Sequence, residues 1–136
     1  MDEIQAAVLR VKLRHLDEDN GRRQDIALRY IREINNPQLR LPSEEFVRNS
    51  VHHIFPVLCE ERNHLQEFLL NNGVETIIHY PIPPHLAECY KRLGYKRGDF
   101  PITEKYSDEV LSLPMFNGMT DEEINFVIEF CNGYDA

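Results

Sequence analysis

The sequence lacks the features that define several broad classes of protein. No apolar run approaches the roughly 18 residues that a membrane-spanning helix needs, and the chain starts with the acidic MDEIQ instead of a basic secretion signal. The three cysteines (Cys59, Cys89 and Cys131) are widely spaced and odd in number, which is typical of reduced thiols. We therefore expect a cytoplasmic protein without membrane segments.

A concentration of positive charge is also missing. The net charge is -8, and the acidic excess lies in residues 51–136, since residues 1–50 contain equal numbers of acidic and basic side chains. Proteins that bind nucleic acids or anionic membranes need a basic surface. The composition therefore predicts that neither is a partner.

Familiar catalytic and metal-binding motifs are absent as well. The six histidines do not form an HExxH pattern, and there is no CxxC, GxSxG, P-loop or GxGxxG. Cys89 follows His85 by four positions, so a Cys/His pair of a small hydrolase is geometrically possible. The alternative is that Cys89 is buried and packs as a small apolar residue. The residues do not indicate catalysis by this chain alone.

The most distinctive stretch runs from Gly73 to Tyr95. A strand-like run ends at His79 and Tyr80, and the prolines that follow predict a rigid extended arm, since proline fixes φ and cannot donate to a sheet. His85 lies at the start of the next expected helix. Neutral histidine and tyrosine can hydrogen-bond hydroxyl-rich or phosphate-bearing ligands. The alternative is that His79 caps the strand and Tyr80 packs in the core.

Periodicity and capping signals predict an α+β domain whose small sheet is covered on one side by helices. The expected helices are residues 2–16, 22–35, 63–72, 85–93, 101–110 and 120–133. The expected strands are residues 51–58, 74–79 and 111–114, with residues 37–50 as a loop. DEDNG at residues 17–21 is expected to break or kink the chain between the first helix and the second. Helix start and stop signals are expected in the capping boxes Asn63 with Gln66 and Thr120 with Glu123, in Pro84 and Pro101 at the first helical position, and in Gly73 as a left-handed stop.

The first helix has an unusually broad apolar surface, formed by Ile4, Val8, Leu9, Val11, Leu13 and Leu16. Such a helix either packs against two different neighbours or lies at the centre of the domain's own core.

Several segments, in this order, carry a resemblance to a known family. They are MDEIQAAVLRVKL, LDEDNGRRQDIALRYI, VHHIFPV, GVETIIHYPIPPHLAECYKRLGY and DFPITEKYSDEVLSLPMFNGMTDEEINFVI. Together they resemble the carboxy-terminal part of the DegT/DnrJ/StrS aminotransferases, from Asp2 to about Asn132. The combination of HYPxPxH, LSLP and GMTxEEI is the most specific part.

The resemblance implies the small domain of a fold type I pyridoxal-phosphate enzyme, with a mostly antiparallel sheet preceded by two long helices. Such enzymes are usually homodimers that transfer an amino group from glutamate to a nucleotide-linked keto-sugar in polysaccharide or antibiotic pathways. Residues 1–35 would connect to a cofactor domain, and residues 36–136 would form the small domain. The resemblance assigns sugar-nucleotide contacts to His79, Tyr80 and His85, with His53 as a further candidate.

The resemblance does not extend to the cofactor site. None of Lys12, Lys91, Lys96 and Lys105 falls where the family has its Schiff-base lysine. We therefore expect pyridoxal phosphate in the full-length family but not on this chain alone, which would be inactive and would associate with a cofactor domain, a full-length counterpart or itself. Related members with histidine in place of that lysine act as dehydratases. The alternative is a stand-alone, non-catalytic module that binds a sugar nucleotide or a protein.

Overall fold

Two short antiparallel strands form the centre of the fold. In the computed structural model, which describes residues 2–136, Phe55 lies opposite Leu113 and Leu58 lies opposite Val110. Single bridges widen the sheet on both sides, joining Arg40 to Leu58 and Ile77 to Ser112. The elements in chain order are α1 (Glu3–Lys12), α2 (Leu16–Glu33), α3 (Glu44–Arg48), β1 (Phe55–Leu58), α4 (Arg62–Asn71), the 3-10 helices η1 (Pro84–Leu86) and η2 (Glu88–Leu93), α5 (Pro101–Glu109), β2 (Val110–Leu113) and α6 (Asp121–Gly133).

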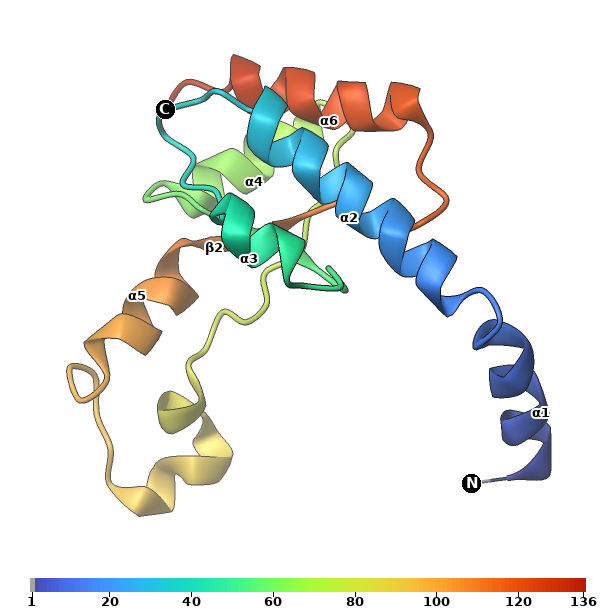
Figure 1. Cartoon of the computed structure of the whole chain (residues 1–136). Coiled ribbons are helices and arrows are strands. Elements are labelled where there is room, and N and C mark those ends of the chain that lie inside the picture. The colour runs from blue at the N-terminus through green and yellow to red at the C-terminus, as the bar shows by residue number, and fades with distance from the viewer. Residues whose placement is uncertain (1) are drawn as a thin grey trace.

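Helices α2, α4 and α6 lie together on one side of the strands, where they enclose the core (Figure 1). Their buried side chains come from one face of each helix and meet Phe55 and Val57 of β1, which alternate with partly exposed neighbours. The largest fully buried side chains are Tyr30, Phe55, Ile26, Leu65, Leu69, Leu111 and Ile124. The predicted α+β class, with a small antiparallel sheet covered by helices on one side, is confirmed.

Several local predictions are confirmed. Thr120 caps α6, and its side chain and that of Glu123 form the reciprocal bonds of a capping box. Gly73 ends the turn after α4 with a φ of 83°. Pro84 and Pro101 each lie at the start of a helix, as their missing N–H allows.

The first helix break is not where the sequence placed it. DEDNG lies inside α2, and the chain turns at residues 13–15 instead. Asp17, Glu18 and Asp19 occupy the first turn of α2, where the helix dipole favours negative charge. The prediction of a break at residues 17–21 is therefore wrong.

Two of the three expected strands are too long, whereas the strand expected at 111–114 is β2 shifted by one residue. Only Phe55–Leu58 of the run 51–58 is a strand, since His52 has a left-handed φ of 48° and turns the chain just before it. Residues 74–79 form no strand beyond the bridge at Ile77, because Val74 N–H bonds the end of α4 instead. The expected loop at 37–50 contains α3, capped by Ser43.

Two further local predictions need correction. Helix α4 begins at Arg62 and has no side-chain cap, so the expected capping box at Asn63 and Gln66 is not formed. Residues 85–93 form 3-10 turns instead of one α-helix.

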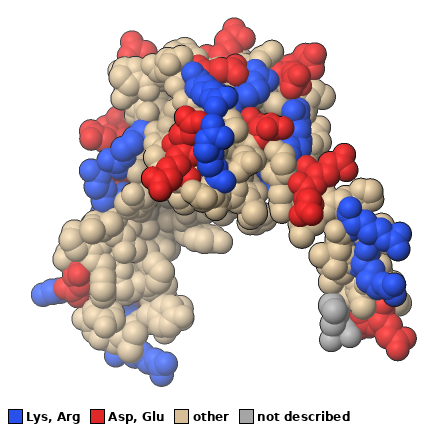
Figure 2. Space-filling view, in the orientation of Figure 1, with Lys and Arg blue, Asp and Glu red and all other residues tan. Residues whose placement is uncertain are grey.

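Two projections extend from the body on the same side (Figures 1 and 2). One is α1, which has no buried residue; Ile4 is 76% exposed and Leu13 is 64% exposed. The alternative that this helix lies at the centre of the chain's own core is therefore wrong. The other projection is formed by residues 80–104. Among residues 2–136, no helix is both long and apolar enough to cross a bilayer.

Candidate site on the proline-rich arm

His79 marks the point where the arm leaves the body. Its Nδ1 lies 2.9 Å from the hydroxyl oxygen of Ser112, a buried residue of β2. Ser112 also exchanges both backbone hydrogen bonds with Ile77, so the chain just before His79 is held to the sheet. The half-buried imidazole is therefore fixed in place by β2.

Tyr80 points away from the core. It is 73% exposed, and its ring lies edge-on to that of His79 with the ring centroids 5.5 Å apart. The alternative that Tyr80 packs in the core is wrong. An exposed tyrosine beside a fixed histidine at the base of a stiff arm is well suited to contact a ligand.

His85 lies in a different environment. Its side chain is only 7% exposed, and Nε2 lies 3.0 Å from Oε1 of Glu104 on α5. The ring of Phe100 packs against the imidazole, with the centroids 4.8 Å apart. His85 is thus enclosed within the projection, whereas His79 and Tyr80 lie at its base.

The Glu104 carboxylate is buried but has several hydrogen-bond donors around it. Burial raises its pKa, yet the backbone N–H groups of Gly98 and Phe100 and the His85 ring outweigh that effect and lower the pKa below the usual range. Glu104 is therefore ionised at neutral pH.

The two neighbouring histidines before β1 differ in their exposure to solvent. His52 is buried and its Nε2 lies 2.7 Å from the carbonyl oxygen of Val47. His53, the further candidate for substrate contact, is exposed in the turn before β1. The two side chains therefore do not act together.

A hollow of about 520 Å³ lies beside His79 on the sheet face away from the helical core. Pro56 and Leu58 of β1 line it, and Arg40 and Tyr106 contribute polar groups. Sequence reasoning missed Arg40 and Tyr106, because only the Arg40–Leu58 bridge and the position of α5 bring them next to His79. Their side chains make the hollow suitable for a ligand with both apolar and anionic parts.

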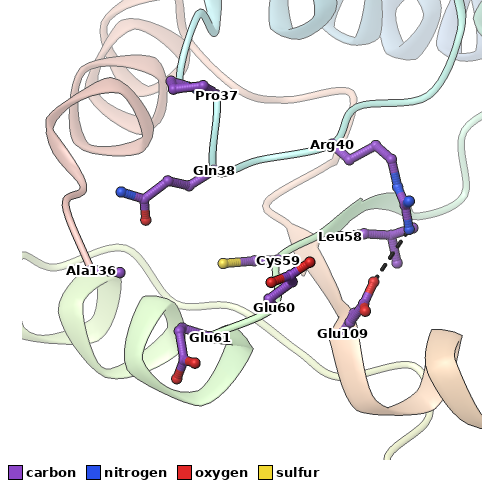
Figure 3. A pocket seen from close by; sticks show the side chains of 9 residues that line it. All are labelled: Pro37, Gln38, Arg40, Leu58, Cys59, Glu60, Glu61, Glu109 and Ala136. Carbon is purple, nitrogen blue, oxygen red and sulfur yellow. Dashed lines mark hydrogen bonds and ion pairs between the residues drawn. The ribbon is translucent and has the colours of Figure 1, made fainter.

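A second cavity has a volume of about 500 Å³. The Cys59 thiol points into it (Figure 3). Arg40 also lines this cavity and pairs with Glu109 at 3.2 Å. Burial raises the pKa of the Cys59 thiol, and the carboxylates of Glu60 and Glu61 act in the same direction. Cys59 is therefore not an activated nucleophile.

The Cys89 and His85 hydrolase hypothesis loses its support in the structure. Cys89 is exposed, which also makes the alternative of a buried Cys89 wrong. The Nε2 atom of His85 is engaged by Glu104. Within residues 2–136, no group of three or more His, Cys, Asp or Glu side chains is placed to hold a metal ion.

The lysines do not fit a pyridoxal-phosphate site within this chain. All four, at positions 12, 91, 96 and 105, are exposed. Lys91 and Lys105 pair with exposed or partly exposed glutamates on their own helices. A Schiff-base lysine is activated in a desolvated pocket, whereas all four of these side chains face solvent.

The profile of the DegT/DnrJ/EryC1/StrS aminotransferase family matches residues 1–131, and the chain belongs to this family. Full-length members of the family bind pyridoxal phosphate.

Individual relatives show how much of such a protein the chain represents. It is 46% identical over 129 residues to the erythromycin biosynthesis sensory transduction protein EryC1 of Saccharopolyspora erythraea, covering 94% of this chain and 35% of that protein. It is 42% identical over 134 residues to the dTDP-3-amino-3,6-dideoxy-alpha-D-galactopyranose transaminase of Aneurinibacillus thermoaerophilus, covering 98% of this chain and 36% of that protein.

A solved structure gives the same proportion. DesV of S. venezuelae, crystallised in complex with a ketimine intermediate, superimposes with a TM-score of 0.91 at 34% identity, covering 98% of this chain and 36% of DesV. The chain therefore spans about a third of the length of the relatives it matches.

Proposed function

We propose that this chain is the small-domain part of a pyridoxal-phosphate-dependent aminotransferase that acts on nucleotide-linked keto-sugars. The observation that carries the proposal is that almost the whole chain superimposes on about a third of DesV, which was solved in complex with a ketimine intermediate. The dTDP-sugar transaminase of A. thermoaerophilus supports a nucleotide-linked sugar as the substrate.

In this proposal the chain contributes substrate contacts. His79 and Tyr80 would hydrogen-bond the sugar nucleotide from the base of the arm, with His53 as a further contact at the surface. His79 suits this role because Ser112 engages its Nδ1, which fixes the ring and leaves Nε2 for the ligand. Arg40 and Tyr106 would add an anion-binding group and a hydroxyl in the adjoining hollow.

The cofactor would be bound by a different segment of polypeptide. The lysines support this division, because all four are exposed and none lies in a desolvated pocket that would activate it. Residues 1–35 would connect to the cofactor-binding part, and residues 36–136 would form the small domain. Alone, the chain would not transfer amino groups.

The apolar surface of α1 supports this division further. Six large apolar side chains between Ile4 and Leu16 are exposed, although surfaces of this kind are normally covered in a soluble protein. We propose that the cofactor domain, or a full-length counterpart, covers them. In its absence, copies of the chain would associate through the same side chains.

Complementation tests the proposal. The chain is co-expressed with the part of the A. thermoaerophilus transaminase that it does not match, and amino transfer from glutamate to a dTDP-linked keto-sugar is measured. The expected result is transamination by the pair and none by either part alone, with His79→Ala reducing it at least tenfold and the exposed-site control Glu129→Gln leaving it unchanged. Transamination by the chain alone would refute the proposal.

The alternative, a stand-alone binding module, is favoured by one observation: His79 and the hollow beside it are formed by this chain without any partner. Calorimetry of the chain with dTDP and UDP distinguishes the two functions. Micromolar binding without a cofactor domain would favour the module, whereas binding that appears only in the co-expressed pair would favour the enzyme.

A further inference from the structure

The projection formed by residues 80–104 holds its shape without an apolar core. Apart from the side chain of His85, Pro83 and Glu104 are its only buried residues, and every residue from Glu88 to Ile102 is exposed. A segment with so few buried contacts normally opens at little cost. Polar interactions must therefore provide the order of this projection.

The carboxylate of Glu104 accounts for four of the side-chain hydrogen bonds of this projection. Oε1 and Oε2 of Glu104 accept the backbone N–H of Gly98 at 2.9 and 2.8 Å, and Oε1 also accepts that of Phe100 at 3.2 Å. The φ of Gly98 is 100°, which bends the loop so that its N–H faces the carboxylate. These bonds close the loop 94–100 onto the first turns of α5.

The same carboxylate also holds the far end of the arm. Nε2 of His85 lies 3.0 Å from Oε1 of Glu104, and the side chains of both residues are less than a tenth exposed. The ring of Phe100 packs against the imidazole. Three segments, the arm, the loop and α5, therefore converge on Glu104.

We propose that Glu104 and His85 are positioning residues, a buried carboxylate–imidazole clamp that fixes the projection relative to the arm and so orients what the arm presents to a ligand. A carboxylate can only accept hydrogen bonds, so the pair requires the proton of neutral His85 to be on Nε2. Nδ1 is then the unprotonated nitrogen. The consequence for substrate binding rests on the proposed function, but the clamp itself does not.

Amide hydrogen exchange of the purified chain tests the clamp without any ligand. Glu104→Gln keeps the shape of the side chain but removes its charge and one of its two acceptor oxygens. We expect exchange in residues 94–100 to rise at least tenfold, while α2 and α6 are unchanged. The matched control Glu88→Gln, an exposed glutamate of the same projection paired only with Lys91, should change none of these segments.

Two outcomes would overturn the proposal: unchanged exchange in residues 94–100, or an equal rise throughout the chain. If Glu104→Gln does not fold, His85→Phe provides the second variant, since it preserves ring packing against Phe100 and removes the donor. Increased exchange confined to the projection would again support the clamp, and no increase there would contradict it.

A spectroscopic measurement separates the clamp from simple packing. The nitrogen-15 chemical shifts of neutral His85 should show the proton on Nε2 in the natural chain, and Glu104→Gln should reduce this preference because an amide can also donate. A proton on Nδ1 in the natural chain would overturn the proposal.

In an active co-expressed pair, Glu104→Gln should raise KM for the sugar nucleotide more than it lowers kcat. The reverse would place Glu104 in the chemical step instead.

The outcomes for the clamp and for the enzyme are distinguishable. Exchange and tautomer are measured on the chain alone, so they hold even if no complex transaminates.

Discussion

The hydroxyl of Tyr30 donates a hydrogen bond of 2.9 Å to the carbonyl oxygen of Pro114, which joins the last turn of α2 to the residue just after β2. The ring is fully buried and lies 5.1 Å from that of Phe55 on β1. One side chain thus connects the long helix to both strands of the sheet.

Tyr30→Phe should lower the free energy of unfolding by about 0.5–1.5 kcal/mol, because it removes the hydrogen bond to the partly buried Pro114 carbonyl. Urea unfolding measures the change, and Tyr90→Phe, at an exposed position, is the control. A loss below 0.3 kcal/mol, which is about the uncertainty of such a comparison, would contradict the importance of this bond. Burial also raises the pKa of Tyr30, so its contribution is complete below pH ~10 and is lost as the pH rises above that value.

Gly73→Ala should be destabilising, by about 1 kcal/mol or more, because the φ of 83° is strained for any residue with a Cβ. The new methyl group would meet only the Phe126 ring at 3.9 Å, so the cost comes from the backbone and not from a clash. Gly21→Ala is the opposite control: Gly21 is inside α2 with open space around it, so alanine should stabilise by about 0.5–1 kcal/mol. Thermal unfolding of both variants checks the two signs, and equal effects would refute the explanation.

The three thiols should react at very different rates. Cys89 is exposed, whereas burial raises the pKa of Cys131 to about 12 and also raises the pKa of Cys59. At pH 8 roughly one Cys131 in ten thousand is then a thiolate, the reactive form. Iodoacetamide followed by peptide mass spectrometry should label Cys89 alone in the folded chain and all three cysteines in urea. Fast labelling of Cys59 in the folded chain would mean that its cavity activates the thiol.

Charged substitutions on α1 should change association but not folding. The double change Val8→Glu and Leu13→Glu adds two charges to the exposed apolar surface between Ile4 and Leu16, which includes α1, a helix with no buried residue. We expect the free energy of unfolding to change by less than about 0.5 kcal/mol, while sedimentation velocity shows weaker self-association. A loss of more than 2 kcal/mol would mean that α1 packs on the body, and Lys12→Gln is the control for a change at an exposed polar position.

Interactions between residues close together in the sequence made the starts of several helices predictable. Thr120 and Glu123 define the start of α6 by bonding each other's backbone, and Pro101 suits only the start of a helix. The arm at residues 81–84 could be predicted from its prolines, which fix φ and cannot donate to a sheet. Such signals do not depend on distant parts of the chain.

Long-range contacts decided the features that the sequence could not predict. The strand expected at residues 74–79 is reduced to one bridge, because α4 takes the N–H of Val74 and His79 bonds Ser112 through its side chain. Arg40, Tyr106 and Glu104 carry no local motif. Their roles follow from the pairing of residue 40 with β1 and from the packing of α5 against the arm.

Borohydride reduction in the presence of pyridoxal phosphate tests the central claim most directly. Purified chain is incubated with the cofactor and reduced, and the modified lysines are identified by mass spectrometry. If the cofactor site lies on another segment of polypeptide, labelling should be sub-stoichiometric and scattered over Lys12, Lys91, Lys96 and Lys105, all of which are exposed. One stoichiometric adduct at a single lysine would show that this chain forms its own cofactor site and would contradict the account.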